Sequence, residues 1–458
     1  MLDEPGDPFG TAELRGRVLD AWAASPARFR EDANAEEDYA LGGYRDRVVV
    51  ELAQNAADAA ARAGVPGRLR LTLRDGTLTA ANTGAPLDAA GVEALSTLRA
   101  SSKRGPDAAG ETVGRFGVGF AAVVAVSDAP RIRSLTGTVG WSRDRTRELV
   151  RGVPALAGEL AERAGHVPVL RLPFADSRAA ADAVPDGFAT VVELPLRDEA
   201  AGQLVARLLG ETGPALPLAL PALAEVVIET ATGTRVLTAE HSGDAATITA
   251  DDALSRWRVT AAGGELHPAV LADRPAEERT RTSWSVRWAI PLAGPDIGPG
   301  LPDDVVLRDQ PIGRLPAGVS AVVHAPTPTD EPLGLPALLL ASFPLSPDRR
   351  HVAPGALTDL LVEQAAEVYA GLLPGLAPGP GLLDLVPGPV GRGELDARIG
   401  RAIAVRLPDV AFLPAVSGSR VRPRDALLLG TGLPGLAEWL APVLPDLIAG
   451  LSRHPAYA

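Results

Sequence analysis

The stretch Glu51-Leu-Ala-Gln-Asn-Ala-Ala-Asp-Ala59 decides the fold, because it places carboxylates and amides on a predicted helix that is otherwise apolar. At about 100° per residue, Asn55 lies roughly 40° around this helix from Glu51, and Asp58 lies roughly 20° to the other side. The three side chains therefore share one face. The other positions are apolar nearly all round, which is typical of a helix inside a larger domain. Buried polar groups need partners, so this face meets either a hydrogen-bonding strand or a ligand.

A second stretch, Val113-Gly-Arg-Phe-Gly-Val-Gly-Phe120, is rich in glycine and runs into an apolar segment, 121–126, that we expect to continue as a helix. Glycines let a backbone approach an anion closely, and the first turn of a helix offers unpaired N–H groups. The loop therefore suits phosphate. It is not a dinucleotide fingerprint, because the preceding residues 101–112 are polar and loop-like where that motif needs a strand. Tight packing of helices on the glycines is the alternative.

Together and in this order, the two stretches resemble the ATP site of the Bergerat-fold superfamily, which contains gyrase, heat-shock chaperones, histidine kinases and MutL. The resemblance is strongest to the sacsin-type and heat shock protein 90-like branches. It covers roughly residues 40–195, with a weaker echo at 335–351. The motifs that carry it are ELAQNAADA at 51–59, ANTGAPL at 81–87, ASSK at 100–103 and VGRFGVGFAAVVAVSDAP at 113–130.

The resemblance implies ATP and Mg²⁺ as cofactors and slow hydrolysis. Glu51 would be the general base that orients water, Asn55 the Mg²⁺ ligand through its amide oxygen, and Asp58 a support for bound water. Lys103, the single lysine of the chain, would stabilise phosphate charge together with the glycine loop. The predicted nucleotide-binding residues are Asn55, Asp58, Asn82, Gly84, Lys103, Gly114, Phe116, Gly117, Val118, Gly119, Phe120 and Thr190.

On the adenine side, the resemblance places Asn82 where most members of the superfamily have an aspartate. An asparagine carbonyl still accepts a hydrogen bond from the adenine amino group, although without charge assistance. Thr190 matches a late strand whose threonine helps to hold adenine, and strand propensity alone is the alternative explanation for it. Asn82, together with Pro86 where most members of the superfamily have a glycine, motivates a second hypothesis, a nucleotide-binding scaffold or partner-recruiting module that does not hydrolyse ATP. Glu51 argues against it, because a scaffold needs no carboxylate beside the Mg²⁺ ligand.

Far along the chain, Ser346-Pro-Asp-Arg-Arg-His351 forms a predicted polar turn. The resemblance maps Arg349 and Arg350 onto an arginine pair of sacsin-type proteins, so we expect both to be catalytic and to reach the γ-phosphate. Ordinary surface arginines are the alternative. The resemblance as a whole implies a chaperone-like conformational switch with protein clients or partner proteins, and it admits a dimer.

Composition limits the other function classes. The 458 residues are 46% hydrophobic, which is ample for sizeable cores, and the net charge of −13 argues against a general nucleic-acid or anionic-membrane surface. Without cysteine there is no disulfide framework, and the six scattered histidines offer no close pair of zinc ligands. The N-terminus lacks the apolar core of a secretory signal, and prolines interrupt every long apolar run, so we expect a cytoplasmic protein with no membrane span.

The expected fold class is α/β: a Bergerat-type two-layer α/β sandwich followed by an α+β second domain and a short C-terminal segment. The predicted domains are 1–215, 216–374, a Pro/Gly linker at 375–396, and 397–458. Within the first domain, alternation and an Asp75-Gly76 turn predict a hairpin. The other predicted elements there are a helix at 11–24 capped by Thr11, an irregular polar strap at 32–44, a helix at 45–63 that stops at Gly64, a helix at 88–100 capped by Asp88, and strands near 167–172 and 188–194.

Overall fold

The structure is a computed structural model of a mixed α/β protein, and it divides into two compact units. Unit 1 comprises Met1–Ala239 with Thr249–Asp252, and unit 2 comprises Glu240–Ile248 with Ala253–Ala458. The residues that the structure describes are 7–42, 45–96, 118–176, 183–275, 278–279, 282–293, 311–325, 327–346, 350–377, 380–415, 417–427, 440 and 442–449.

Unit 1 contains a mixed sheet, because β1 pairs antiparallel with β2 on one side and parallel with β7 on the other. The strand order in this unit is β8-β7-β1-β2-β6-β3-β4-β5. The strands are β1 (Gly67–Arg74), β2 (Thr77–Asn82), β3 (Arg131–Ser134), β4 (Gly137–Gly140), β5 (Phe174–Ala175), β6 (Thr190–Pro195), β7 (Leu223–Thr230) and β8 (Gly233–Ser242).

The hairpin between β1 and β2 confirms the turn prediction. Asp75 and Gly76 both have left-handed backbones, with φ of 50° and 68°, which is the requirement of a type I′ turn. Alternation then places Leu69, Leu71 and Leu78 on one face of the sheet, where they join the largest hydrophobic core of unit 1. Turn and pattern agree on the register, so both strands form where the sequence predicts them.

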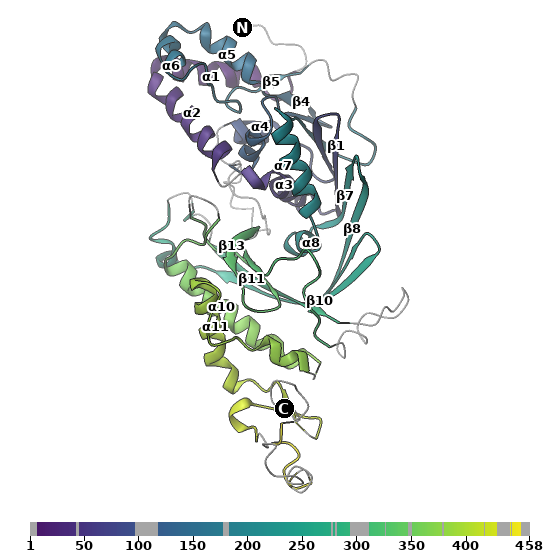
Figure 1. Cartoon of the computed structure of the whole chain (residues 1–458). Helices are drawn as coiled ribbons and strands as arrows, with labels where there is room; N and C mark the ends of the chain where they lie inside the picture. The colour runs from purple at the N-terminus through teal and green to yellow at the C-terminus, as the bar shows by residue number, and fades with distance from the viewer. Residues whose placement is uncertain are drawn as a thin grey trace. The chain divides into compact units, whose positions relative to one another are not determined.

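Helix α3 (Val48–Ala63) packs on this core face of the sheet with Val49, Leu52 and neighbouring alanines, and it lies beside β1 and α7 in Figure 1. It ends at Gly64, whose φ of 64° makes it a left-handed C-cap, as the stop signal predicted. The other helices of unit 1 are α1 (Thr11–Ala24), α2 (Pro26–Leu41), α4 (Ala89–Ser96), α5 (Arg143–Arg151), α6 (Ala157–Glu162), α7 (Glu199–Glu211) and α8 (Ala215–Ala219).

Unit 2 combines a sheet of order β13-β12-β14-β11-β10-β9 with two long helices, α10 (Ala356–Leu372) and α11 (Glu394–Arg406). In β11, Trp288 is buried, donates its indole N–H to the carbonyl oxygen of Ala365 over 2.9 Å, and packs edge-on against Tyr369. The strands are β9 (Ala245–Ala250), β10 (Ala253–Glu265), β11 (Ser283–Leu292), β12 (Val322–His324), β13 (Pro328–Pro332) and β14 (Leu338–Ala341).

Helices α10 and α11 run side by side in Figure 1. Arg406 of α11 joins them through ion pairs to Glu363 and Glu367 of α10, at 2.8 and 2.9 Å. Among the described residues, no helix is both long enough and apolar enough to cross a membrane.

Several local predictions for unit 1 are wrong. The predicted strap at 32–44 is largely helix α2, and Thr11 is the first residue of α1, whose first turn is capped instead by the Asp7 carboxylate at 3.0 Å from the amide of Ala12. The segment 121–126 is largely helical as expected, but as a 3₁₀ helix, η2 (Val118–Ala125), which begins within the glycine-rich stretch. Residues 167–172 form no strand.

The units also divide the chain differently from the sequence-based boundaries. Unit 1 extends past residue 215, because β7 completes its sheet by pairing with β1. In the stretch 375–396, the segment η7 (Pro380–Leu385) buries Leu382 and Leu385 in the core of unit 2, and α11 begins at Glu394. These described parts of the stretch belong to the folded unit.

Candidate functional site

The three polar side chains on one face of α3 differ in their exposure to solvent. Asp58 is buried, Glu51 is half-buried and Asn55 is exposed, although nearly every neighbouring position on the helix is buried in the core. The gradient arises because α3 packs Leu52 and most of its alanines and valines into the core, whereas Asn55 lies on the exposed side of the helix. A carboxylate and an amide oxygen therefore reach the surface of a helix that is otherwise internal.

The carboxylate of Glu51 lies directly against the backbone of Gly119. A Cβ atom added at Gly119 would stand 2.9 Å from Cδ of Glu51 and closer still to Oε2, so only glycine leaves room for this approach. The next residue, Phe120, is buried and packs on Trp141 with the ring centroids 5.6 Å apart. The helix motif and the end of the glycine-rich motif thus meet at Glu51 and Gly119.

A second contact joins α3 to the loop after β2. Gly84 has a φ of 111°, and a Cβ there would stand 2.5 Å from the carbonyl oxygen of Ala59 and from the amide nitrogen of Ala60. The amide of Ala85 donates to the Ala59 carbonyl oxygen over 2.9 Å. The loop therefore crosses the helix backbone next to Asp58, and glycine is required both by conformation and by space.

The predicted adenine-side residues lie next to each other. Asn82 at the end of β2 is the register partner of Thr190 in β6, and they are only 8% and 9% exposed. The Asn82 side-chain amide donates to the carbonyl oxygen of Thr83 over 2.9 Å. This bond turns the N–H₂ group toward the loop and leaves the Oδ1 atom as the acceptor of the side chain.

Two of the remaining predicted residues, Val118 and Arg350, lie in the described part of the chain. Val118 opens η2, but its side chain is outside the described residues. Arg350 lies in unit 2, 3.7 Å from the carboxylate of Asp330, whose amide donates to the Arg350 carbonyl oxygen; its catalytic role stays a prediction. The predicted residues that lie wholly outside the described part of the chain are Lys103, Gly114, Phe116, Gly117 and Arg349.

Glu36 is a buried carboxylate that the sequence did not single out. It lies on α2, and its two oxygens accept the backbone amides of Val169 and Leu170, the latter over 3.0 Å. Burial raises the pKa of Glu36 to about 7, while these hydrogen bonds and the nearby Arg171 and Arg143 guanidinium groups act to lower the pKa. The only signal in the sequence was an acidic residue at a helical spacing of seven from Phe29, which is also buried.

Ser134 is the other residue that sequence reasoning missed. It follows Ile132 at the inward-facing spacing of two in β3, so the alternation marks it as a polar side chain in a core position. Its hydroxyl contacts the loop after β2 and the Thr190 side chain.

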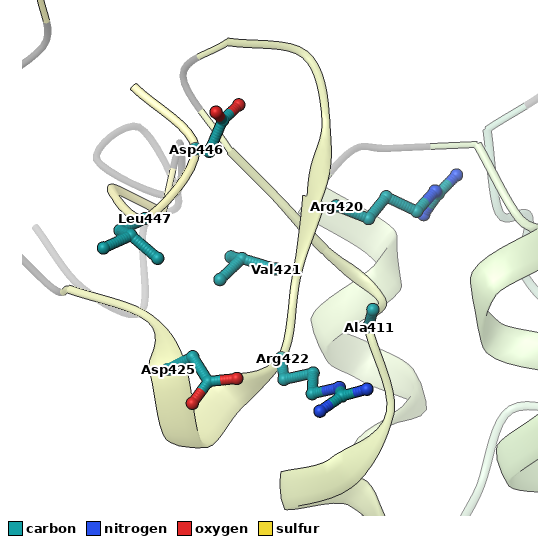
Figure 2. A pocket seen from close by; sticks show the side chains of 7 residues that line it. All are labelled: Ala411, Arg420, Val421, Arg422, Asp425, Asp446 and Leu447. Atoms are coloured by element: carbon teal, nitrogen blue, oxygen red, sulfur yellow. The ribbon is translucent and has the colours of Figure 1, made fainter. Parts of the chain in front are cut away.

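In unit 2, a pocket of about 570 Å³ is open to the surface (Figure 2). Two of its charged groups are occupied within the fold: Arg420 donates to the carbonyl oxygen of Phe412 over 3.2 Å, and Asp446 accepts the hydroxyl of Ser419 over 3.0 Å. The side chains that line it are Ala411, Arg420, Val421, Arg422, Asp425, Asp446 and Leu447.

Within the described residues, no group of three or more His, Cys, Asp or Glu side chains is arranged to hold a metal ion. A Mg²⁺ ion that arrives with a nucleotide needs less, because it keeps several waters and takes oxygens from the phosphates, so one or two protein oxygens suffice. The exposed amide of Asn55 is a donor of this kind.

No protein-family model matches the chain, and no curated protein matches it either.

Proposed function

We propose that unit 1 binds Mg·ATP in a Bergerat-type site and hydrolyses it slowly. One observation carries the proposal: the Glu51 carboxylate of α3 lies against Gly119, at the end of the glycine-rich motif. Glycine-rich backbone followed by a helical turn suits phosphate, and a carboxylate beside it is placed to orient a water molecule toward the terminal phosphate.

The neighbouring side chains have the chemistry that the proposal requires. Asn55, one helical turn after Glu51, would hold Mg²⁺ through its amide oxygen, and the bound ion would neutralise phosphate charge. Asn82 and Thr190 offer hydrogen-bonding groups to a base at the ends of adjacent strands. The loop at Gly84 ties that side of the site to α3. The chaperone-like role with protein clients stays a prediction from the resemblance alone.

The test is calorimetric titration of the purified chain with ATP, with and without Mg²⁺, followed by measurement of phosphate release. Glu51→Gln should leave ATP affinity within about twofold and lower the rate of phosphate release by about 10²-fold or more, the scale of a lost general base. Glu148→Gln is the matched control, because Glu148 is an exposed helical glutamate of α5. It should change neither quantity.

The outcomes separate the alternatives. Binding without phosphate release in the parent protein would favour the non-hydrolysing scaffold. An unchanged rate in Glu51→Gln would remove Glu51 from the mechanism, and absence of nucleotide binding would refute the proposed function.

A further inference from the structure

Three buried polar side chains form a row across adjacent strands of unit 1. Ser134 of β3 is the register partner of Thr190 in β6, and Thr190 is the register partner of Asn82 in β2. Ile132, Val192 and Ala80, two residues away on the same strands, belong to the core that includes α3. Since side chains alternate along a strand, the polar row lies on this same face. Ser134 is 7% exposed, so its hydroxyl needs partners within the fold.

Ser134 finds these partners on both sides. Its Oγ atom accepts the backbone amide of Leu87 over 2.9 Å, lies 3.2 Å from the carbonyl oxygen of Ala189, and lies 3.3 Å from the hydroxyl oxygen of Thr190. The Leu87 carbonyl oxygen is held as well, by the hydroxyl of Thr136. The end of the loop that begins at Asn82 is therefore fixed to the turn after β3.

Only one arrangement of protons makes hydrogen bonds of all three contacts of Ser134. An amide can only donate and a carbonyl oxygen can only accept, so the single proton of Ser134 goes to Ala189. Its remaining lone pair then accepts the proton of Thr190. The Thr190 oxygen is left with lone pairs, and Asn82, one N–H of which is bonded to Thr83, presents its Oδ1 atom as a second acceptor.

We infer that Ser134 is a positioning residue that fixes Thr190 as a hydrogen-bond acceptor and thereby makes the site select a base with an amino group at C6. This inference rests on the proposed function, because it concerns the base end of the same nucleotide site. ATP carries the required amino group. Inosine triphosphate has a carbonyl oxygen at C6 and a protonated N1, where ATP has an amino group at C6 and an unprotonated N1. Its carbonyl oxygen would face two acceptors, which disfavours binding.

The experiment compares the affinities of Mg·ATP and Mg·ITP by calorimetry. The parent protein should prefer ATP, and Ser134→Ala should lower the ATP-to-ITP affinity ratio about fivefold, the scale of one hydrogen bond, because the freed Thr190 hydroxyl can then donate to a carbonyl. Ser134→Thr keeps the hydroxyl and should retain the ratio. Ser127→Ala is the matched control, because Ser127 is a buried serine that donates to the other end of β6, at Pro195 over 2.7 Å.

A loss of packing would weaken both nucleotides equally, so only the ratio reports positioning. Thr190→Val should lower the ratio by itself, and adding Ser134→Ala to it should lower the ratio no further, because both changes remove the same interaction. This variant also tests the inference if Ser134→Ala does not fold. ATP binding with an unchanged ratio in Ser134→Ala, or additive effects in the double variant, would overturn the role of Ser134 alone, whereas absence of all nucleotide binding would overturn the proposed function.

Discussion

The proposed function predicts that Gly119→Ala abolishes most ATP hydrolysis without unfolding the protein. Carbon atoms in good contact lie about 3.5–4.0 Å apart, whereas the new Cβ would stand 2.9 Å from Cδ of Glu51 and closer to Oε2. The carboxylate must therefore move by about 1 Å. It can do so at little cost in stability, because it is the end of a flexible side chain and η2 has an ordinary backbone at this position.

A displacement of about 1 Å in a catalytic group can lower a rate by roughly 10²-fold. We expect phosphate release by Gly119→Ala to fall on that scale, with a melting temperature within a few degrees of the parent and with ATP still bound. Gly16→Ala is the control, because a Cβ at this position of α1 meets nothing within 4 Å. Measurements of phosphate release, calorimetric affinity and thermal unfolding on the three proteins complete the test.

Two results would contradict this reasoning. If Gly119→Ala hydrolysed ATP at the parental rate, the position of the Glu51 carboxylate would not matter to catalysis. If it unfolded, the substitution would be testing packing, and the argument that only a flexible side chain must move would be wrong.

Three further changes test other parts of the site. Gly84→Ala should destabilise the fold by roughly 3 kcal/mol in urea unfolding, because the backbone of α3 cannot yield and the φ of 111° is strained for alanine; a loss below about 1 kcal/mol would contradict the contact. Asn55→Ala should leave thermal stability unchanged, since Asn55 is exposed, but should remove the Mg²⁺ dependence of ATP affinity measured by titration. The raised pKa of Glu36 means that the folded protein binds its proton more tightly than the unfolded chain, so this contribution to stability is complete below about pH 4.5 and is lost as the pH rises through about 7. Between pH 5 and 8, the unfolding free energy of the parent should therefore fall relative to that of Glu36→Gln by roughly 2 to 3 kcal/mol, and a constant difference would show that Glu36 titrates normally.

Elements with a local signal were predictable from the sequence. The β1–β2 hairpin follows from Asp75-Gly76 between alternating strands, and α3 follows from its apolar pattern and the stop at Gly64. These predictions hold because the information lies within a few residues of the element itself. The polar face of α3 likewise marks Glu51 and Asn55 as candidate site residues, because three polar side chains on one side of an apolar helix form a local signal.

Helix α2 and the segment at 167–172 show where local signals fail. The acidic stretch at 32–44 carries little periodicity, and α2 is anchored by Glu36, whose oxygens bind the amides of Val169 and Leu170. Those amides would otherwise be available for a strand ladder. The two amides therefore bind the side chain of Glu36, which is distant in sequence, instead of a neighbouring strand. The residues around each of these two segments contain no sign of this pairing.

Sequence patterns alone singled out Glu51, Asn55 and Asn82 as candidate site residues, whereas the contacts among the candidates became visible only in the folded protein. Strand order places β6 between β2 and β3, and only this order lines up Asn82, Thr190 and Ser134 across the sheet. Glu51 likewise meets Gly119 because α3 and η2 pack on the same core. Periodicity and turn residues indicate the conformation of one segment. Contacts such as Glu51 with Gly119 depend on which segments, distant in sequence, pack together, and the free energy of the whole core decides that packing.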